Sequence, residues 1–105
     1  NLSDVQTGVR QVLMNPELGL RDECFVYNIM TEKLREVGLT RGLHRGFASE
    51  MQKIGFVRFD EKGTRFNGKC HQIYVREHIL DEGIVENELV ELLKHPNLPL
   101  TKEEF

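Results

Sequence analysis

The sequence predicts an α+β fold that is mainly α-helical. Apolar residues recur at helical spacing over three stretches in the first half of the chain. Between residues 56 and 76 the spacing changes to the alternation typical of β-strands, and a last helical stretch follows. A length of 105 residues fits one domain. We place this domain at residues 1–95 and a flexible C-terminal tail at 96–105.

The first two helices are marked by local signals at their ends. Valines at helical spacing predict a helix over Ser3–Met14, with Ser3 able to cap it. Asn15 and Pro16 end this helix, because the residue before a proline avoids helical torsions. A second apolar stripe predicts a helix over Asp22–Val37, and Gly38 is placed to stop it.

A third helix is predicted over Thr40–Ile54, with Thr40 as its cap and Gly55 as its stop. Its apolar face carries Leu43, Phe47, Met51 and Ile54. The opposite, open face carries Arg41, Arg45, Ser49 and Gln52. This helix is therefore expected to be apolar inside and basic outside.

The next segment reads as a β-hairpin followed by a helix. Phe56–Phe59 and Gln72–Arg76 alternate and are rich in β-branched and aromatic residues, which predicts two strands. The connection Asp60–His71 contains two glycine turn signals and several basic residues. A last helix is predicted over Asp81–Lys94, with its acidic residues mainly outside.

The charges are unevenly distributed along the chain. The net charge of −3 argues against a nucleic-acid partner if it is taken alone. However, the stretch from Arg41 to Arg76 holds eight basic and three acidic residues, a net charge of +5, and the remainder carries −8. Such asymmetry points to a polyanionic partner, although chance clustering on solvated faces is the simpler alternative.

Helix, helix, basic helix and then a hairpin with a basic tip is the element order of a winged-helix domain. In helix-turn-helix geometry the second helix of the pair enters the major groove of DNA. Here the pair is Asp22–Val37 and Thr40–Ile54, and the hairpin that follows is the two-stranded basic wing. The helix Asp81–Lys94 is an extra C-terminal helix.

Two stretches, Met30–Gly38 and Arg45–Phe56, resemble a known family of replication proteins. The first stretch is a predicted helix that ends in glycine. In the second, three residues separate Phe47 from Met51 and three more separate Met51 from the pair Gly55-Phe56. A basic hairpin that ends in Ile-Tyr-Val follows. This pattern is similar to the winged-helix region of viral, phage and plasmid primase–helicases, in which the module follows a superfamily-three helicase core. The resemblance covers about Val26 to Arg76 and implies a C-terminal accessory domain of a replication protein, for example from a phage. It places no catalytic residue on this chain.

Ten residues are expected to contact DNA: Arg41, Arg45, Gln52, Lys53, Arg58, Lys62, Arg65, Phe66, Lys69 and Arg76. Arginine can pair with guanine and glutamine with adenine, so Arg45 and Gln52 are candidates for base reading. The alternative is that they bind only phosphate or water, and for Arg41 we favour a phosphate contact.

The hairpin residues have two interpretations each. The cations Lys62, Arg65 and Lys69 can follow a phosphate ridge, or simply keep the loop soluble. Phe66 can stack on an unpaired base or fold back onto the core. Arg58 and Arg76, with Tyr74 between them, are expected to share the outer face of the hairpin.

Other classes of function find little support in the sequence. Cys24, Cys70 and the histidines lack the spacing of a zinc site, and no catalytic motif or cofactor signature is present. We therefore expect no metal, no cofactor and no enzyme activity. Two cysteines and no apolar run of bilayer length suggest a cytoplasmic, reducing location without membrane contact.

The partner is expected to be DNA, as duplex or fork, and RNA or single strands form a weaker option. The alternative is a protein-interaction or oligomerisation module, in which the acidic last helix docks the helicase core or a sister subunit. The chain starts at Asn1 rather than at methionine, so we expect a domain cut from a longer protein or a processed product.

Overall fold

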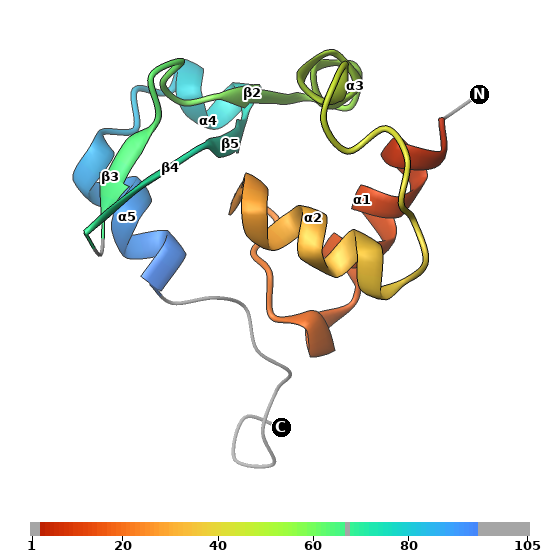
Figure 1. The fold of residues 1–105 in the computed structure, drawn as a ribbon. Coiled ribbons are helices and arrows are strands. Elements are labelled where there is room, and N and C mark those ends of the chain that lie inside the picture. The colour runs from red at the N-terminus through yellow and green to blue at the C-terminus, as the bar shows by residue number, and fades with distance from the viewer. Residues whose placement is uncertain (1–2, 67, 95–105) are drawn as a thin grey trace.

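The computed structural model describes residues 3–66 and 68–94, which form an α+β fold. The predicted tail, residues 96–105, lies outside the described residues. The helices are α1 (Asp4–Met14), a 3₁₀ turn η1 (Pro16–Leu18), α2 (Tyr27–Glu36), α3 (Phe47–Lys53), α4 (Glu77–Asp81) and α5 (Glu86–Lys94) (Figure 1). The strands are β1 (Cys24–Val26), β2 (Phe56–Arg58), β3 (Thr64–Phe66), β4 (Lys69–His71) and β5 (Ile73–Arg76).

Three strands form an antiparallel sheet in the order β1-β5-β2. Because side chains alternate across a sheet, its two faces carry different residues. Phe25 and Tyr74 are register partners on one face, and Cys24 and Val75 are partners on the other. The strands β3 and β4 form a separate two-stranded hairpin within the β2–β5 connection.

One face of the sheet packs on the first three helices. Phe25, Phe56 and Tyr74 join a core with α1, α2 and α3 in which Met30, Leu34 and Met51 are fully buried. The rings of Phe25 and Phe56 lie 5.0 Å apart, and those of Phe47 and Tyr74 lie 5.4 Å apart, both edge-to-face. Aromatic pairs prefer this geometry.

The other face of the sheet packs on α5. Cys24, Val26, Ile73 and Val75 are buried there together with Leu89 of α5. The fold therefore has three layers, with α1–α3 on one side of the sheet and α5 on the other (Figure 1).

Several elements agree with the sequence predictions. Helix α1 has the predicted bounds, and Ser3 caps it through a capping box with Gln6. Gly38 and Gly55 follow the ends of α2 and α3 as predicted. Strands β2 and β5 form where alternation predicts them, and the long basic connection folds into the hairpin β3–β4.

The predicted helix over Asp22–Val37 starts too early. Residues 24–26 form β1 and pair with β5, so α2 begins only at Tyr27. All three residues of β1 are buried, because the sheet is covered on both faces. A short apolar run of this kind has no alternation that would distinguish it from a helix.

The predicted helix over Thr40–Ile54 is also wrong in its first half. Residues 37–46 form an irregular loop, and α3 begins at Phe47. Gly42 and Gly46 have φ of +77° and +81°, which is the left-handed region that glycine adopts without steric cost. These torsions are incompatible with a continuous right-handed helix.

The predicted helix over Asp81–Lys94 starts five residues too early, and helix α4 before it was not predicted. Helix α4 ends at Asp81, a turn through Gly83 follows, and α5 begins at Glu86. Among the residues that the structure describes, no helix is both long and apolar enough to cross a membrane.

Candidate nucleic-acid interface

Six of the predicted cations are exposed in two separate segments. Arg41 and Arg45 lie in the loop between α2 and α3, and Arg58, Lys62, Arg65 and Lys69 lie at the end of β2 and in the hairpin. We call these six residues the basic face. Apart from Arg58, none of these side chains forms an ion pair or a side-chain hydrogen bond with another described residue.

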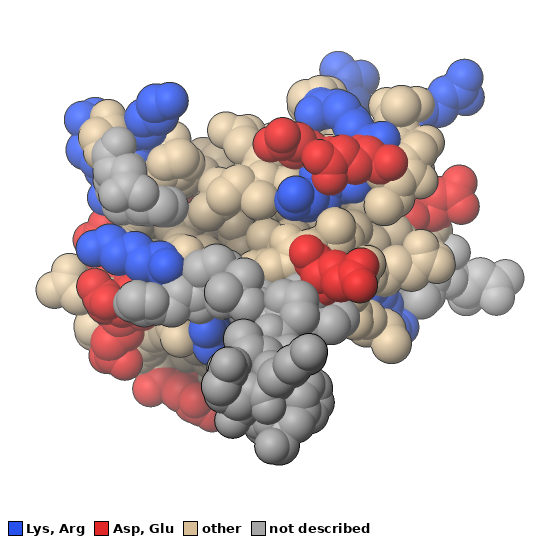
Figure 2. All heavy atoms as spheres, turned by 90° about the horizontal axis from the view of Figure 1, so that it is seen from below, with Lys and Arg blue, Asp and Glu red and all other residues tan. Residues whose placement is uncertain are grey.

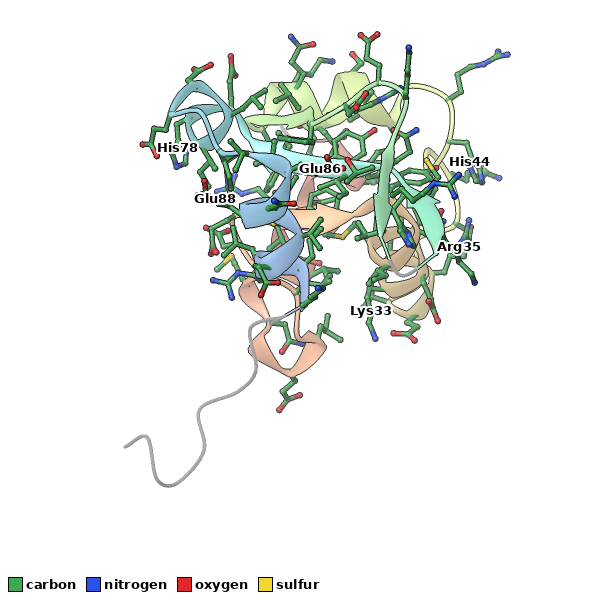
Figure 3. The ribbon with its side chains drawn as sticks, turned by 90° about the vertical axis from the view of Figure 1, so that its left-hand side faces the viewer. Lys33, Arg35, His44, His78, Glu86 and Glu88 are labelled. Atoms are coloured by element: carbon green, nitrogen blue, oxygen red, sulfur yellow. The ribbon has the colours of Figure 1, made fainter. Side chains whose placement is uncertain are left out.

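The two segments lie on one side of the molecule, at opposite ends. In Figure 3 the α2–α3 loop and the hairpin are both on the side toward which Lys33, Arg35 and His44 point, and Glu88 and His78 lie on the other side. Figure 2 shows Lys and Arg side chains at both ends of its upper edge, with acidic side chains close to the right-hand group. A phosphate backbone could therefore contact both groups at once.

The loop is held to the core between its two arginines. Leu43 is 2% exposed and packs with Phe47 and Met51. Its carbonyl oxygen accepts a hydrogen bond from the hydroxyl of Tyr27, and His44 Nδ1 lies 3.1 Å from the same hydroxyl. These contacts fix the backbone that carries Arg41 and Arg45.

The hairpin is shaped by a tight turn at its base. The backbone N–H of Lys62 donates to Asp60 Oδ1 at 2.9 Å, and the N–H of Gly63 donates to the Asp60 carbonyl at 2.9 Å. Arg65 then pairs with Cys70 across β3 and β4. Arg65 also lines a shallow cavity with Glu86 and Glu91 of α5, so carboxylates lie near this end of the basic face. The side chain of Phe66 lies outside what the structure describes, and its predicted role stays a prediction.

Helix α3 contributes less to the basic face than the sequence predicts. Arg41 and Arg45 precede this helix and do not share its open face with Gln52, which is exposed. Lys53 is exposed, but its Nζ lies 3.7 Å from Oε1 of Glu50 and forms an ion pair with it. Glu50 in turn accepts hydrogen bonds from Ser3 and Gln6 of the α1 N-terminus, at 2.5 and 2.8 Å.

Arg76 and Tyr74 do not lie on an outer face of the hairpin. Tyr74 is 3% exposed and belongs to the core. Arg76 forms an ion pair of 2.6 Å with Asp22, and its guanidinium lies 4.3 Å from the centre of the Phe56 ring. Arg58 and Arg76 lie on the same face of the sheet as Tyr74, because Arg58 is the register partner of Tyr74 and Arg76 follows Tyr74 by two residues. The prediction of an outer face is therefore wrong.

Lys53 and Arg76 instead belong to a second cavity. This cavity has a volume of about 520 Å³ and lies between the ends of α1 and α3 and the strands. Arg10, Lys53 and Arg76 line it together with apolar side chains such as Leu13 and Met14. It is separate from the cleft that Arg58 lines, which is described next.

A cleft of about 290 Å³ lies between the α2–α3 loop, the start of α3 and the strands β2 and β5. The residues that line this cleft are Tyr27, His44, Gly46, Phe47, Ala48, Arg58, Gln72 and Tyr74. Burial raises the pKa of Tyr27 and of Tyr74, and for Tyr74 the interaction with Arg58 opposes the rise. Both hydroxyl groups are therefore neutral hydrogen-bonding groups at physiological pH.

Sequence reasoning missed three residues around this cleft. Tyr27 and His44 line it, and Arg35 is close enough to Tyr27 to oppose the rise of its pKa. Tyr27 is the first residue of α2, so its position depends on where β1 ends. The only available signal for Arg35 is its charge, which lies outside the basic stretch of the sequence.

Within the described part of the chain, no three His, Cys, Asp or Glu side chains are placed to hold a metal ion. Cys24 is buried in β1, three residues before α2 begins, and Cys70 is exposed; both are free thiols. No family model, curated protein or solved structure matches the sequence.

Proposed function

We propose that this chain is a winged-helix DNA-binding domain that serves as an accessory domain of a replication protein. The observation that carries the proposal is the basic face, in which Arg58 and five cations that have no ion-pair partner among the described residues occupy one side of the fold. Three helices followed by a long basic hairpin support the winged-helix assignment. The resemblance to primase–helicases supports the role in replication.

The geometry favours contacts to the DNA backbone over base reading. The loop of residues 37–46 is longer than the turn of three or four residues in a standard helix-turn-helix, and α3 has only 7 residues. The arginines of the basic face lie in the loop and the hairpin, and Gln52 is the predicted base reader on α3. Backbone contacts position a protein on DNA without reading sequence, so we expect weak sequence preference.

A salt titration with a blunt 20-bp duplex tests the proposal. Six cations that each neutralise one phosphate give a slope of log affinity against log salt of about −5. Replacing Lys62 and Lys69 with alanine should reduce the slope by about 2 and weaken binding to all sequences alike. The matched control replaces Arg10 and Lys53, which lie at the second cavity, and should leave the slope unchanged.

The outcomes separate the candidate functions. A slope near zero, or no binding at about 0.05 M salt, contradicts DNA binding by the basic face. If the chain then sediments as a dimer, the interaction module predicted as the alternative replaces this proposal. Equal changes in slope for the two double variants would show that only total charge matters, which contradicts the role assigned to the basic face.

A further inference from the structure

The cleft between the α2–α3 loop and the strands β2 and β5 has an aromatic floor and a charged rim. Phe47 and Tyr74 are buried at its base, Tyr27 is half-buried, and His44 and Arg58 are exposed at its edge. The Tyr27 and Phe47 rings lie 5.0 Å apart at 79°, and the Tyr27 and His44 rings lie 6.5 Å apart at 61°. The rings therefore stand at steep angles to one another. Phe47 and Tyr74 are covered, so the rings that a ligand can contact are those of the half-buried Tyr27 and the exposed His44.

The cleft also contains an unsatisfied polar group. Gln72 is half-buried in the wall formed by the sheet, and its side-chain oxygen is covered and accepts no hydrogen bond from a described residue. Buried acceptors without a donor are costly and uncommon. As the side chain stands, this oxygen is closed off from the cleft; a rotation of the Gln72 amide would bring it to the cleft, where an N–H group of a ligand would supply the missing donor.

The shape and chemistry of the cleft restrict its ligand. A volume of about 290 Å³ is at the lower end of small-molecule sites, so the cleft admits one planar ring system. The accessible rings of Tyr27 and His44 favour stacking, the amide of Gln72 favours an edge with N–H and C=O groups, and Arg58 favours a neighbouring anion. A nucleobase attached to its phosphate has all three features.

The position of the cleft connects this ligand to the basic face. Arg45 and His44 precede Gly46 on one wall, and Arg58 leads into the hairpin on the other wall. A strand that contacts both halves of the basic face passes over the opening. We propose that the cleft holds one unpaired nucleobase of the bound DNA, an inference that rests on the proposed function.

Binding to two DNAs that differ only in an unpaired extension tests this inference. The probes are the blunt 20-bp duplex and the same duplex with a five-nucleotide single-stranded 3′ extension. One stacked base contributes about 1–3 kcal/mol, which corresponds to about 5- to 150-fold tighter binding of the extended duplex. Fluorescence anisotropy at a fixed salt concentration measures both affinities.

Variants of adjacent α3 residues locate the effect. Ala48→Trp fills the cleft, and the ratio of the two affinities should fall to about one. Ser49→Trp is the matched control, because Ser49 is exposed and does not line the cleft, and the ratio should be retained. Gln72→Met keeps the side-chain length but removes the amide, and should lower the ratio by at least about threefold without the bulk of tryptophan.

The outcomes distinguish this inference from the proposed function. If the wild-type protein binds both DNAs equally well, the inference is wrong while duplex binding stands. A ratio that survives both Ala48→Trp and Gln72→Met, in variants that melt cooperatively, also overturns it. A third outcome is that the protein binds single-stranded DNA but not the duplex, and that Ala48→Trp weakens this binding. In that case the inference about the cleft stands, and duplex binding in the proposed function is wrong.

Discussion

Replacing Gly42 or Gly46 with alanine tests the loop that carries Arg41 and Arg45. Both glycines have left-handed torsions, with φ of +77° and +81°. An L-residue in this region costs about 1–2 kcal/mol, so Gly46→Ala should destabilise the fold by about that amount. A Cβ atom at Gly46 meets no other atom within 4 Å, so no steric cost is added.

Gly42→Ala should be the more destabilising substitution of the two. A Cβ atom at this position would lie 2.7 Å from Cγ2 of Val5, and Val5 is only 6% exposed in the core. Overpacking of a core costs about 1–3 kcal/mol, which brings the expected loss to about 2–5 kcal/mol when the cost of the torsion is added. The difference between the two variants therefore measures how closely the loop approaches α1.

The sign of the change in the free energy of unfolding distinguishes this loop from the helix that the sequence predicts. If residues 40–46 were helical, each substitution would stabilise the protein by about 1 kcal/mol, because alanine is the better helix former. Urea unfolding at 25 °C, followed by circular dichroism, gives the change in free energy from the midpoint at constant slope. Ser49→Ala in α3 is the control and should stay within about 0.5 kcal/mol. Increased stability of both glycine variants would refute the loop, and equal losses would refute the close approach to Val5.

Two further predictions concern the side of the sheet that packs on α5. Burial, reinforced by the charge of Glu23, raises the pKa of Cys24 to about 12, so a thiol reagent at pH 8 should label only Cys70 in the folded chain and both cysteines after unfolding. The pKa of Cys24 in the unfolded chain is about 8.5. The stability that the neutral thiol contributes is therefore complete below about pH 8.5 and is lost as the pH rises toward 12. Unfolding in urea at pH 10 should need less denaturant than unfolding at pH 8. Leu89→Ala should cost about 2–5 kcal/mol in the same unfolding assay, since Leu89 is fully buried, whereas Val85→Ala, at a side chain that is 53% exposed, should change little; similar losses for both would contradict the packing of α5.

The fold could be predicted where its signals are local. The cap at Ser3, the stop at Asn15 and Pro16, and the glycines after α2 and α3 are read from a few neighbouring residues. Strand β1 could not be predicted in this way, because its partner β5 lies about 50 residues further along the chain. Only the tertiary pairing makes residues 24–26 extended.

The loop before α3 shows a second reason for failure. Leu43 has helical spacing to Phe47 and is buried as a helix would bury it, yet it reaches the core from irregular backbone. Glycine in a helical pattern lowers helix propensity, but propensity alone does not reveal that Gly42 and Gly46 adopt left-handed torsions. Burial was therefore predicted correctly at Leu43 while the backbone conformation was not.

The sequence predicts which charged residues belong to the candidate site, but not how their side chains are arranged in space. The basic residues of the loop and hairpin follow from the sequence, because no ion pair with another described residue turns these side chains inward. Arg76 has the same charge, but the strand register turns it inward against Phe56 and Asp22. The cleft joins residues from α2, α3 and two strands, so it exists only once the layers are packed.

The net charge of −3 and the basic face predict opposite responses to DNA, and the ionic strength decides between them. At about 0.15 M salt the Debye length is about 8 Å, whereas the molecule measures 39 × 31 × 27 Å. DNA in contact with the basic face is then affected by the charges next to it, including Glu86 and Glu91 near Arg65, and hardly by carboxylates on the far side such as Glu88 (Figure 3). At about 0.01 M salt the Debye length is about 30 Å, which spans the whole domain. For the proposed DNA binding, the net charge is therefore expected to oppose binding only at very low salt, and the local distribution of charge is expected to govern it at physiological salt.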